Sequence, residues 1–206
     1  GMLFDAFDDL EDATSEGTDI RAERRDAVDE TESWRWTPDD ELRETLLADE
    51  PQAIVDALLA AVRDGAEPSD LAAPVVDAAA TRVAQFGTAN EFSDWNTVHH
   101  TFTYANAVRE AALRTEAEEL YRGVFDAAIS VYLDRFLNSP PATIPEPGEG
   151  GDPDDLRSDL LDAMDREGAV NEAGQAAVEW FAVADDPEAV WTTLGETLLR
   201  EDAGFH

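Results

Sequence analysis

The sequence predicts an all-α protein, a multi-helix array of packed helical hairpins with about seven to nine helices. Apolar residues recur three and four positions apart through most of the chain, which is the spacing of a helix with one buried face. No stretch alternates apolar and polar residues over more than a few positions, as a half-buried strand would. An acidic residue followed by proline, a common opening of a helix, recurs at 49–51, 67–68 and 186–187.

The chain begins with an acidic segment, residues 2–36, in which large apolar residues are few. We expect an arm or weak helices here, with Trp34 and Trp36 fixing its end to the body of the protein. The region that follows, residues 37–138, is expected to form a helical subdomain that carries a pair of adjacent histidines. Its helices are predicted at 37–47, 51–65, 69–86, 94–113 and 116–137.

A segment rich in proline and glycine, residues 139–152, separates the two halves of the chain. We interpret it as a connector, because these residues interrupt regular structure. Residues 153–206 are expected to form a C-terminal helical subdomain packed on the first. Its helices are predicted at 153–167, 170–184 and 187–199.

The acidic charge is spread along every segment of the chain. The formal net charge is −34, from 48 acidic residues against 14 basic ones, and all 14 are arginine. At 43% hydrophobic residues the chain can still fold, unlike a disordered acidic protein. Dispersed acidity without lysine is typical of a halophile, where concentrated salt screens the repulsion. The same charge excludes nucleic acid as a partner, since no basic patch is available for phosphates.

The chain contains no cysteine, which excludes disulfides, thiolate nucleophiles and cysteine-ligated metal clusters. It also has no apolar run approaching the roughly 18 residues that a membrane span requires, and no signal-peptide pattern. We therefore expect a cytoplasmic protein without a membrane partner.

One stretch stands apart, because no charged residue occurs from Trp95 to Val108. Two of the three histidines, His99 and His100, lie inside it. A run this free of charge in so acidic a chain predicts a buried helix, capped at its start by Asp94. Helical spacing places four polar residues on one stripe: His99, Thr103, Asn106 and Glu110.

Three interpretations of this stripe remain open. The polar stripe could be an exposed face of the helix, a buried hydrogen-bonded network, or a functional site. In the functional interpretation, His99 or His100 is a metal ligand or proton donor, and Thr103 and Asn106 orient it. Adjacent histidines on one helix point about 100° apart, so a divalent transition metal would need further ligands.

The C-terminal end of the chain offers such ligands. Asp202 and His206 are four residues apart and share a face if the last helix extends that far. The predicted metal ligands are therefore His99, His100, Asp202 and His206. Other carboxylates, such as Asp126 and Asp134, are expected on solvated helix faces.

Three segments, residues 86–108, 132–138 and 198–206, carry a resemblance to a known family. They include Phe86-Gly-Thr-Ala-Asn-Glu-Phe, the histidine pair, Tyr132-Leu-Asp-Arg-Phe-Leu-Asn and the final Ala-Gly-Phe-His. In these segments the chain resembles questin-oxidase-like helical proteins, and chains that also carry Rieske-type domains. The resemblance implies oxidation of a cyclic or aromatic compound, with His99 or His100 and His206 as the residues concerned. Because the chain lacks cysteine, a Rieske cluster would have to belong to a partner domain.

Two functions of different kinds follow from these observations. The first is an oxidoreductase-type domain, or a domain associated with one, that acts on a small hydrophobic organic molecule. The alternative is a non-catalytic helical module of a halophile that mediates protein interaction or forms a homodimer. A ligand-binding sensor is a third possibility.

Overall fold

The computed structural model describes residues 1–27, 34–115, 117–138, 140–148, 150–184 and 186–200. Within these residues the chain forms nine α-helices and one short 3-10 helix, without any strand, so the prediction of an all-α helical array is confirmed. The chain divides into two compact units, residues 1–142 and 143–206. No helix among the described residues has both the length and the apolar character needed to cross a membrane.

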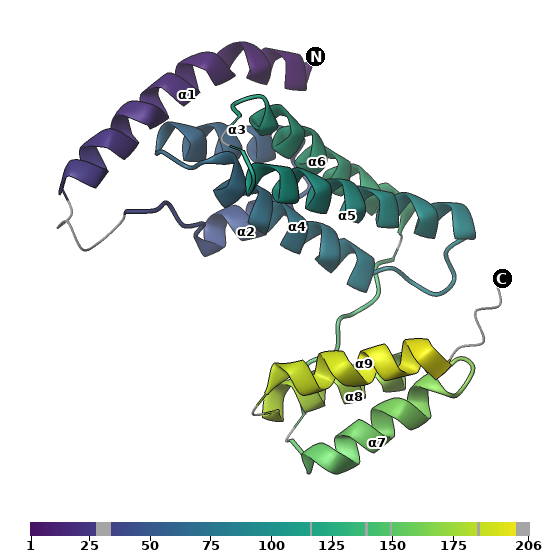
Figure 1. Ribbon diagram of the computed structural model, residues 1–206. Helices are drawn as coiled ribbons and strands as arrows, with labels where there is room; N and C mark the ends of the chain where they lie inside the picture. The colour runs from purple at the N-terminus through teal and green to yellow at the C-terminus, as the bar shows by residue number, and fades with distance from the viewer. Residues whose placement is uncertain (28–33, 116, 139, 149, 185, 201–206) are drawn as a thin grey trace. The chain divides into compact units, whose positions relative to one another are not determined.

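The first unit contains six α-helices, whose order along the chain can be followed in Figure 1. They are α1 (Met2–Ala27), α2 (Asp40–Leu46), α3 (Pro51–Arg63), α4 (Pro68–Ala84), α5 (Phe92–Ala112) and α6 (Leu120–Asp134), followed by the 3-10 helix η1 (Arg135–Leu137). Helices α4, α5 and α6 pack against one another, and α1 packs mainly against α3. Consecutive helices are therefore often neighbours in space, as in the predicted hairpins.

Local sequence explains where these helices begin. The carboxylate of Asp39 accepts a hydrogen bond from the backbone N of Leu42 at 2.8 Å and caps α2. Proline opens both α3 and α4, where its missing N–H leaves no helical hydrogen bond unmade. The tight turn between them needs Gly65, whose φ of 96° is unfavourable for other residues.

Residues 2–27 form one continuous helix, where an arm or weak helices were expected. The buried face of α1 consists of Ala6, Leu10, Ala13, Thr14 and Gly17, most of which are small. Small side chains let the two backbones approach: a Cβ added to Gly17 would lie 2.1 Å from the carbonyl oxygen of Val62 in α3. This close crossing makes α1 an integral part of the first unit.

The core of the first unit lies among α3, α4 and α6. Its largest fully buried side chains include Leu58, Leu71, Tyr121, Phe125 and Val124. The buried hydroxyl of Tyr121 has a hydrogen-bond partner, since it donates to the carbonyl of Ala66 at 2.6 Å. Burial raises the pKa of Tyr121 to about 12, so this donor keeps its proton over the physiological range.

The second unit contains three helices: α7 (Pro153–Met164), α8 (Val170–Val183) and α9 (Pro187–Arg200). Asp152 caps α7 by accepting from the backbone N of Asp154 at 3.0 Å. A separate small core forms around Leu160, Trp180 and Val190. The second unit begins inside the predicted connector, because the side chain of Gln175 in α8 donates to the carbonyl of Glu146 at 3.0 Å.

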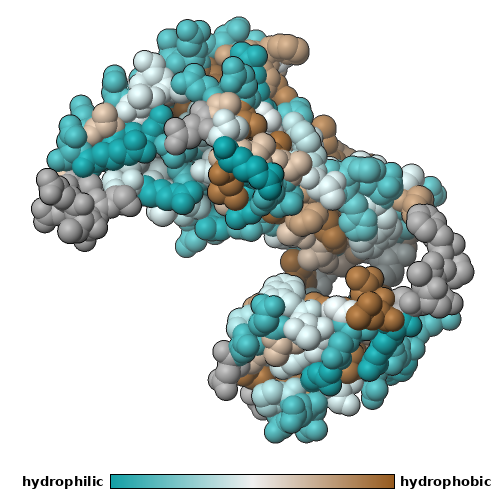
Figure 2. Space-filling view, viewed as in Figure 1, coloured by the Kyte–Doolittle hydropathy of each residue, from teal (hydrophilic) through white to brown (hydrophobic). Residues whose placement is uncertain are grey.

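Figure 2 shows hydrophilic residues over much of the visible surface of each unit. This agrees with a chain in which 48 residues are acidic. How the C-terminal unit packs on the first stays a prediction.

Candidate functional site

The polar residues predicted as a site lie on α5, which packs by one face against α4 and α6. The buried residues of α5 recur at helical spacing and form this contact face: Val98, Thr101, Ala105, Val108 and Ala112. The helix begins at Phe92 after Glu91. Asp94, expected as the cap, lies instead in the first turn, where the helix dipole favours its negative charge.

The opposite face of α5 is exposed to solvent. We call its exposed residues the α5 outer face: Phe92, Ser93, Asn96, Thr97, His99, His100, Thr103, Tyr104, Asn106 and Ala107. The prediction of a buried helix therefore holds for one face only. Of the three interpretations of the polar stripe, an exposed face fits His99, Thr103 and Asn106.

The hydroxyl groups of this face bond to their own helix. Thr97 donates to the carbonyl of Ser93 at 2.9 Å, and Thr103 donates to the carbonyl of His99 at 3.0 Å. The imidazole of His99 lies beside Trp95, with 5.7 Å between ring centroids. Thr103 thus satisfies backbone carbonyls, where an orienting bond to an imidazole was expected.

Only two of the four predicted metal ligands, His99 and His100, belong to the part of the chain that the structure describes. Asp202 and His206 lie outside the described residues, and His99 and His100 are exposed on α5. Among the described residues, no three histidine, aspartate or glutamate side chains are grouped as a metal ion would require. A site that uses His206 stays a prediction.

Hollows in the surface of the first unit lie away from the histidine pair. They occur between α2 and α3, between α1 and α6, and beside the turn from α3 to α4. None of these hollows is lined by His99 or His100. A molecule that contacts either imidazole would therefore meet an open helix surface in this part of the chain.

The buried polar cluster associated with α5 lies on its inner face. Asp134, expected on a solvated face, is only 3% exposed, whereas Asp126 is exposed as expected. The hydroxyl of Thr101 donates to Oδ1 of Asp134 at 3.2 Å. Burial raises the pKa of Asp134, while the Thr101 hydrogen bond and the charge of Arg82 lower it. The sequence could have indicated that Thr101 is buried, because Thr101 follows Val98 by three residues and so lies on the apolar side of the helix.

In comparisons with known proteins, no family model, no curated protein and no solved structure matches the chain. The resemblance to questin-oxidase-like proteins accordingly stays a prediction, as does a Rieske-type partner.

Proposed function

We propose that this chain is a helical interaction module that forms a homodimer through the α5 outer face. One observation carries the proposal: this face is exposed, yet no charged residue occurs from Trp95 to Val108 in a chain with a net charge of −34. Interface centres are depleted of charged residues in the same way.

The absence of both signs of charge favours a partner like the protein itself. A basic partner would be attracted to the carboxylates that cover other helices, and a face without them would add nothing to its recognition. Two copies of so acidic a chain repel each other at most contacts. Contact through their charge-free faces avoids burying carboxylates, and a twofold axis makes one face serve both copies.

The chemistry of the α5 outer face suits burial in such a contact. Phe92 is 77% exposed and Tyr104 is 40% exposed, so each copy offers aromatic surface that association would remove from water. The hydroxyls of Thr97 and Thr103 already donate to carbonyls of their own helix and would not lose a partner on burial. The imidazoles and the amides of Asn96 and Asn106 would bond across the interface.

Sedimentation equilibrium of the full chain in concentrated potassium chloride tests this proposal. We expect a concentration-dependent dimer whose affinity rises with salt, because salt screens the repulsion between the two acidic copies. Ala107→Glu places a carboxylate on the α5 outer face and is expected to weaken association at least about tenfold, the effect of roughly 1.4 kcal/mol.

Ala53→Glu is the matched control, because Ala53 is an exposed alanine on the outer side of α3. This variant should associate like the parent chain. A monomer at all concentrations, or equal weakening by both substitutions, would reject the proposal.

The oxidoreductase function implied by the resemblance stays a prediction. It receives less support from the geometry, since His99 and His100 line none of the hollows described for the first unit.

A further inference from the structure

A group of arginines surrounds a hollow beside the turn from α3 to α4. The hollow has a volume of about 640 Å³ and is lined by Arg25 of α1, Arg35, Ser69 of α4, and Arg114 and Thr115 after α5, together with Trp34, Glu67, Ala112 and Leu113. We call it the arginine hollow. Among its lining residues, three are arginine and one is acidic, although the whole chain has 48 acidic residues against 14 basic ones.

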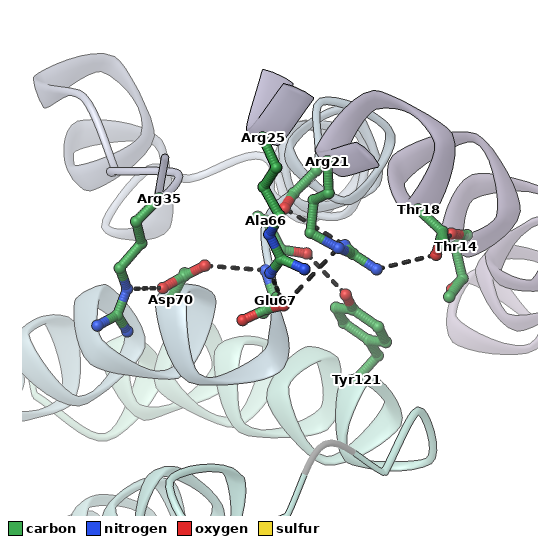
Figure 3. Close-up of polar contacts among 10 residues, drawn as sticks. Thr14, Thr18, Arg21, Arg25, Arg35, Ala66, Glu67, Asp70 and Tyr121 are labelled. Carbon is green, nitrogen blue, oxygen red and sulfur yellow. Dashed lines mark hydrogen bonds and ion pairs between the residues drawn. The ribbon is translucent and has the colours of Figure 1, made fainter. Parts of the chain in front are cut away.

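Arg35 is held in a fixed position by a buried carboxylate. The Asp70 side chain is 3% exposed and accepts from Nε of Arg35 at 2.7 Å and from the backbone N of Glu67 at 3.0 Å. Figure 3 shows that the two terminal nitrogens of Arg35 point away from Asp70. The guanidinium is therefore anchored through one nitrogen, and its terminal fork is oriented in advance.

The single lining carboxylate is already shared between two arginines of α1. Oε1 of Glu67 lies 3.3 Å from Nη2 of Arg25 and 3.7 Å from Nε of Arg21. Arg114 pairs with Glu110 at 3.1 Å, but its side chain stays 74% exposed. Each of the three lining arginines thus contacts one carboxylate, and of these carboxylates only Glu67 lines the hollow itself.

We propose that the arginine hollow binds a small anion that carries a phosphate group, with Arg35, Arg25 and Arg114 as its ligands. A phosphate offers several acceptor oxygens and close to two negative charges, which match three guanidinium groups. The hydroxyls of Ser69 and Thr115 line the same hollow and add neutral donors. A chloride ion lacks the paired acceptors that a guanidinium fork binds.

The overall charge of −34 does not prevent this binding in concentrated salt. At about 1 M salt the screening length is about 3 Å, so distant carboxylates contribute little. Direct hydrogen-bonded contacts within the hollow then decide whether an anion binds.

Titration with inorganic phosphate at constant ionic strength tests the site, with NMR detection of the arginine Nε–H and tryptophan indole N–H signals. We expect saturable shifts of the Arg35 and Trp34 signals. Arg35→Gln and Arg114→Gln are each expected to weaken binding about tenfold, the loss of one charge-assisted hydrogen bond. Arg35→Gln removes the partner of the buried Asp70 and could unfold the protein; in that case Arg114→Gln still tests the site.

Arg43→Gln is the matched control, because Arg43 of α2 is a half-exposed arginine paired with Asp77 at 3.3 Å away from the hollow. Its phosphate affinity should equal that of the parent chain. Binding that Arg43→Gln weakens as much as Arg114→Gln, or the absence of saturable shifts, would overturn the site. Phosphate binding should persist in Ala107→Glu, so the two proposals fail independently.

Discussion

Asp134 is the residue whose environment departs furthest from expectation. One carboxylate oxygen accepts from Thr101, and the other is buried without a hydrogen-bond partner among the described residues. Burial raises the pKa of Asp134 because a desolvated carboxylate disfavours its charge. Since the folded protein holds this proton more tightly than the unfolded chain, the contribution to stability is present at low pH. It is lost as the pH rises through the raised pKa.

Asp134→Asn is expected to remove this pH dependence. As the pH rises from below the ordinary aspartate pKa of 3.8 to neutral, the free energy of unfolding of the parent chain should fall relative to that of the variant. Denaturant unfolding across this pH range measures the difference. Asp126→Asn is the matched control, because Asp126 lies on the exposed side of the same helix. Parallel profiles for parent and Asp134→Asn would show that burial does not perturb this carboxylate.

At the scale of the helices, α5 shows what the sequence can and cannot predict. Helical spacing predicts one apolar side made of Val98, Phe102, Ala105, Val108 and Ala112. Four of these residues are buried, and Phe102 is partly buried. Burial of the other face was inferred from missing charge. That inference was wrong because an uncharged polar side chain can lie on an exposed helix and hydrogen-bond to the backbone of that helix, as Thr103 does.

The packing of α1 was missed for a different physical reason. Its buried face includes three small residues spaced seven and four positions apart, Ala6, Ala13 and Gly17, which allow close approach and give little hydrophobic signal. The arginine hollow was equally hidden. Arg114 is distant in sequence from Arg25 and Arg35, and only the tertiary arrangement of α1, α4 and the end of α5 brings the three to one hollow.

Gly17→Ala is expected to loosen α1. The new Cβ would lie 2.1 Å from the carbonyl oxygen of Val62, so the helix must move away from α3 at a cost of about 1–3 kcal/mol. Hydrogen exchange followed by mass spectrometry should show faster exchange of α1 peptides than in the parent chain.

Ser15→Ala controls for helix propensity, because Ser15 is exposed on the same helix. It should keep or increase protection, since alanine favours helices. If α1 in Gly17→Ala exchanged as slowly as in Ser15→Ala, the close crossing of α1 and α3 would not hold this helix in place.

At the scale of the whole molecule, the acidic residues and the proposed binding surfaces lie on different parts of the protein. Carboxylates are spread through the chain, and this pattern is consistent with the predicted halophilic habitat. The proposed dimer surface and the proposed anion site both lie where this acidic pattern is interrupted. The α5 outer face carries no charge from Trp95 to Val108, and the arginine hollow gathers basic residues.

The central claim is that two copies meet through the α5 outer face, and a distance between spin labels tests it most directly. The chain has no cysteine, so a label can be attached at one introduced position. Thr97→Cys places it within the α5 outer face, and Ala53→Cys places it on the exposed side of α3. In concentrated salt, pulsed electron spin resonance should detect a short distance between labels at residue 97 and a longer one, or none, at residue 53. An equal distance at both positions, or no dipolar coupling at residue 97 at the highest soluble concentration, would contradict the homodimer.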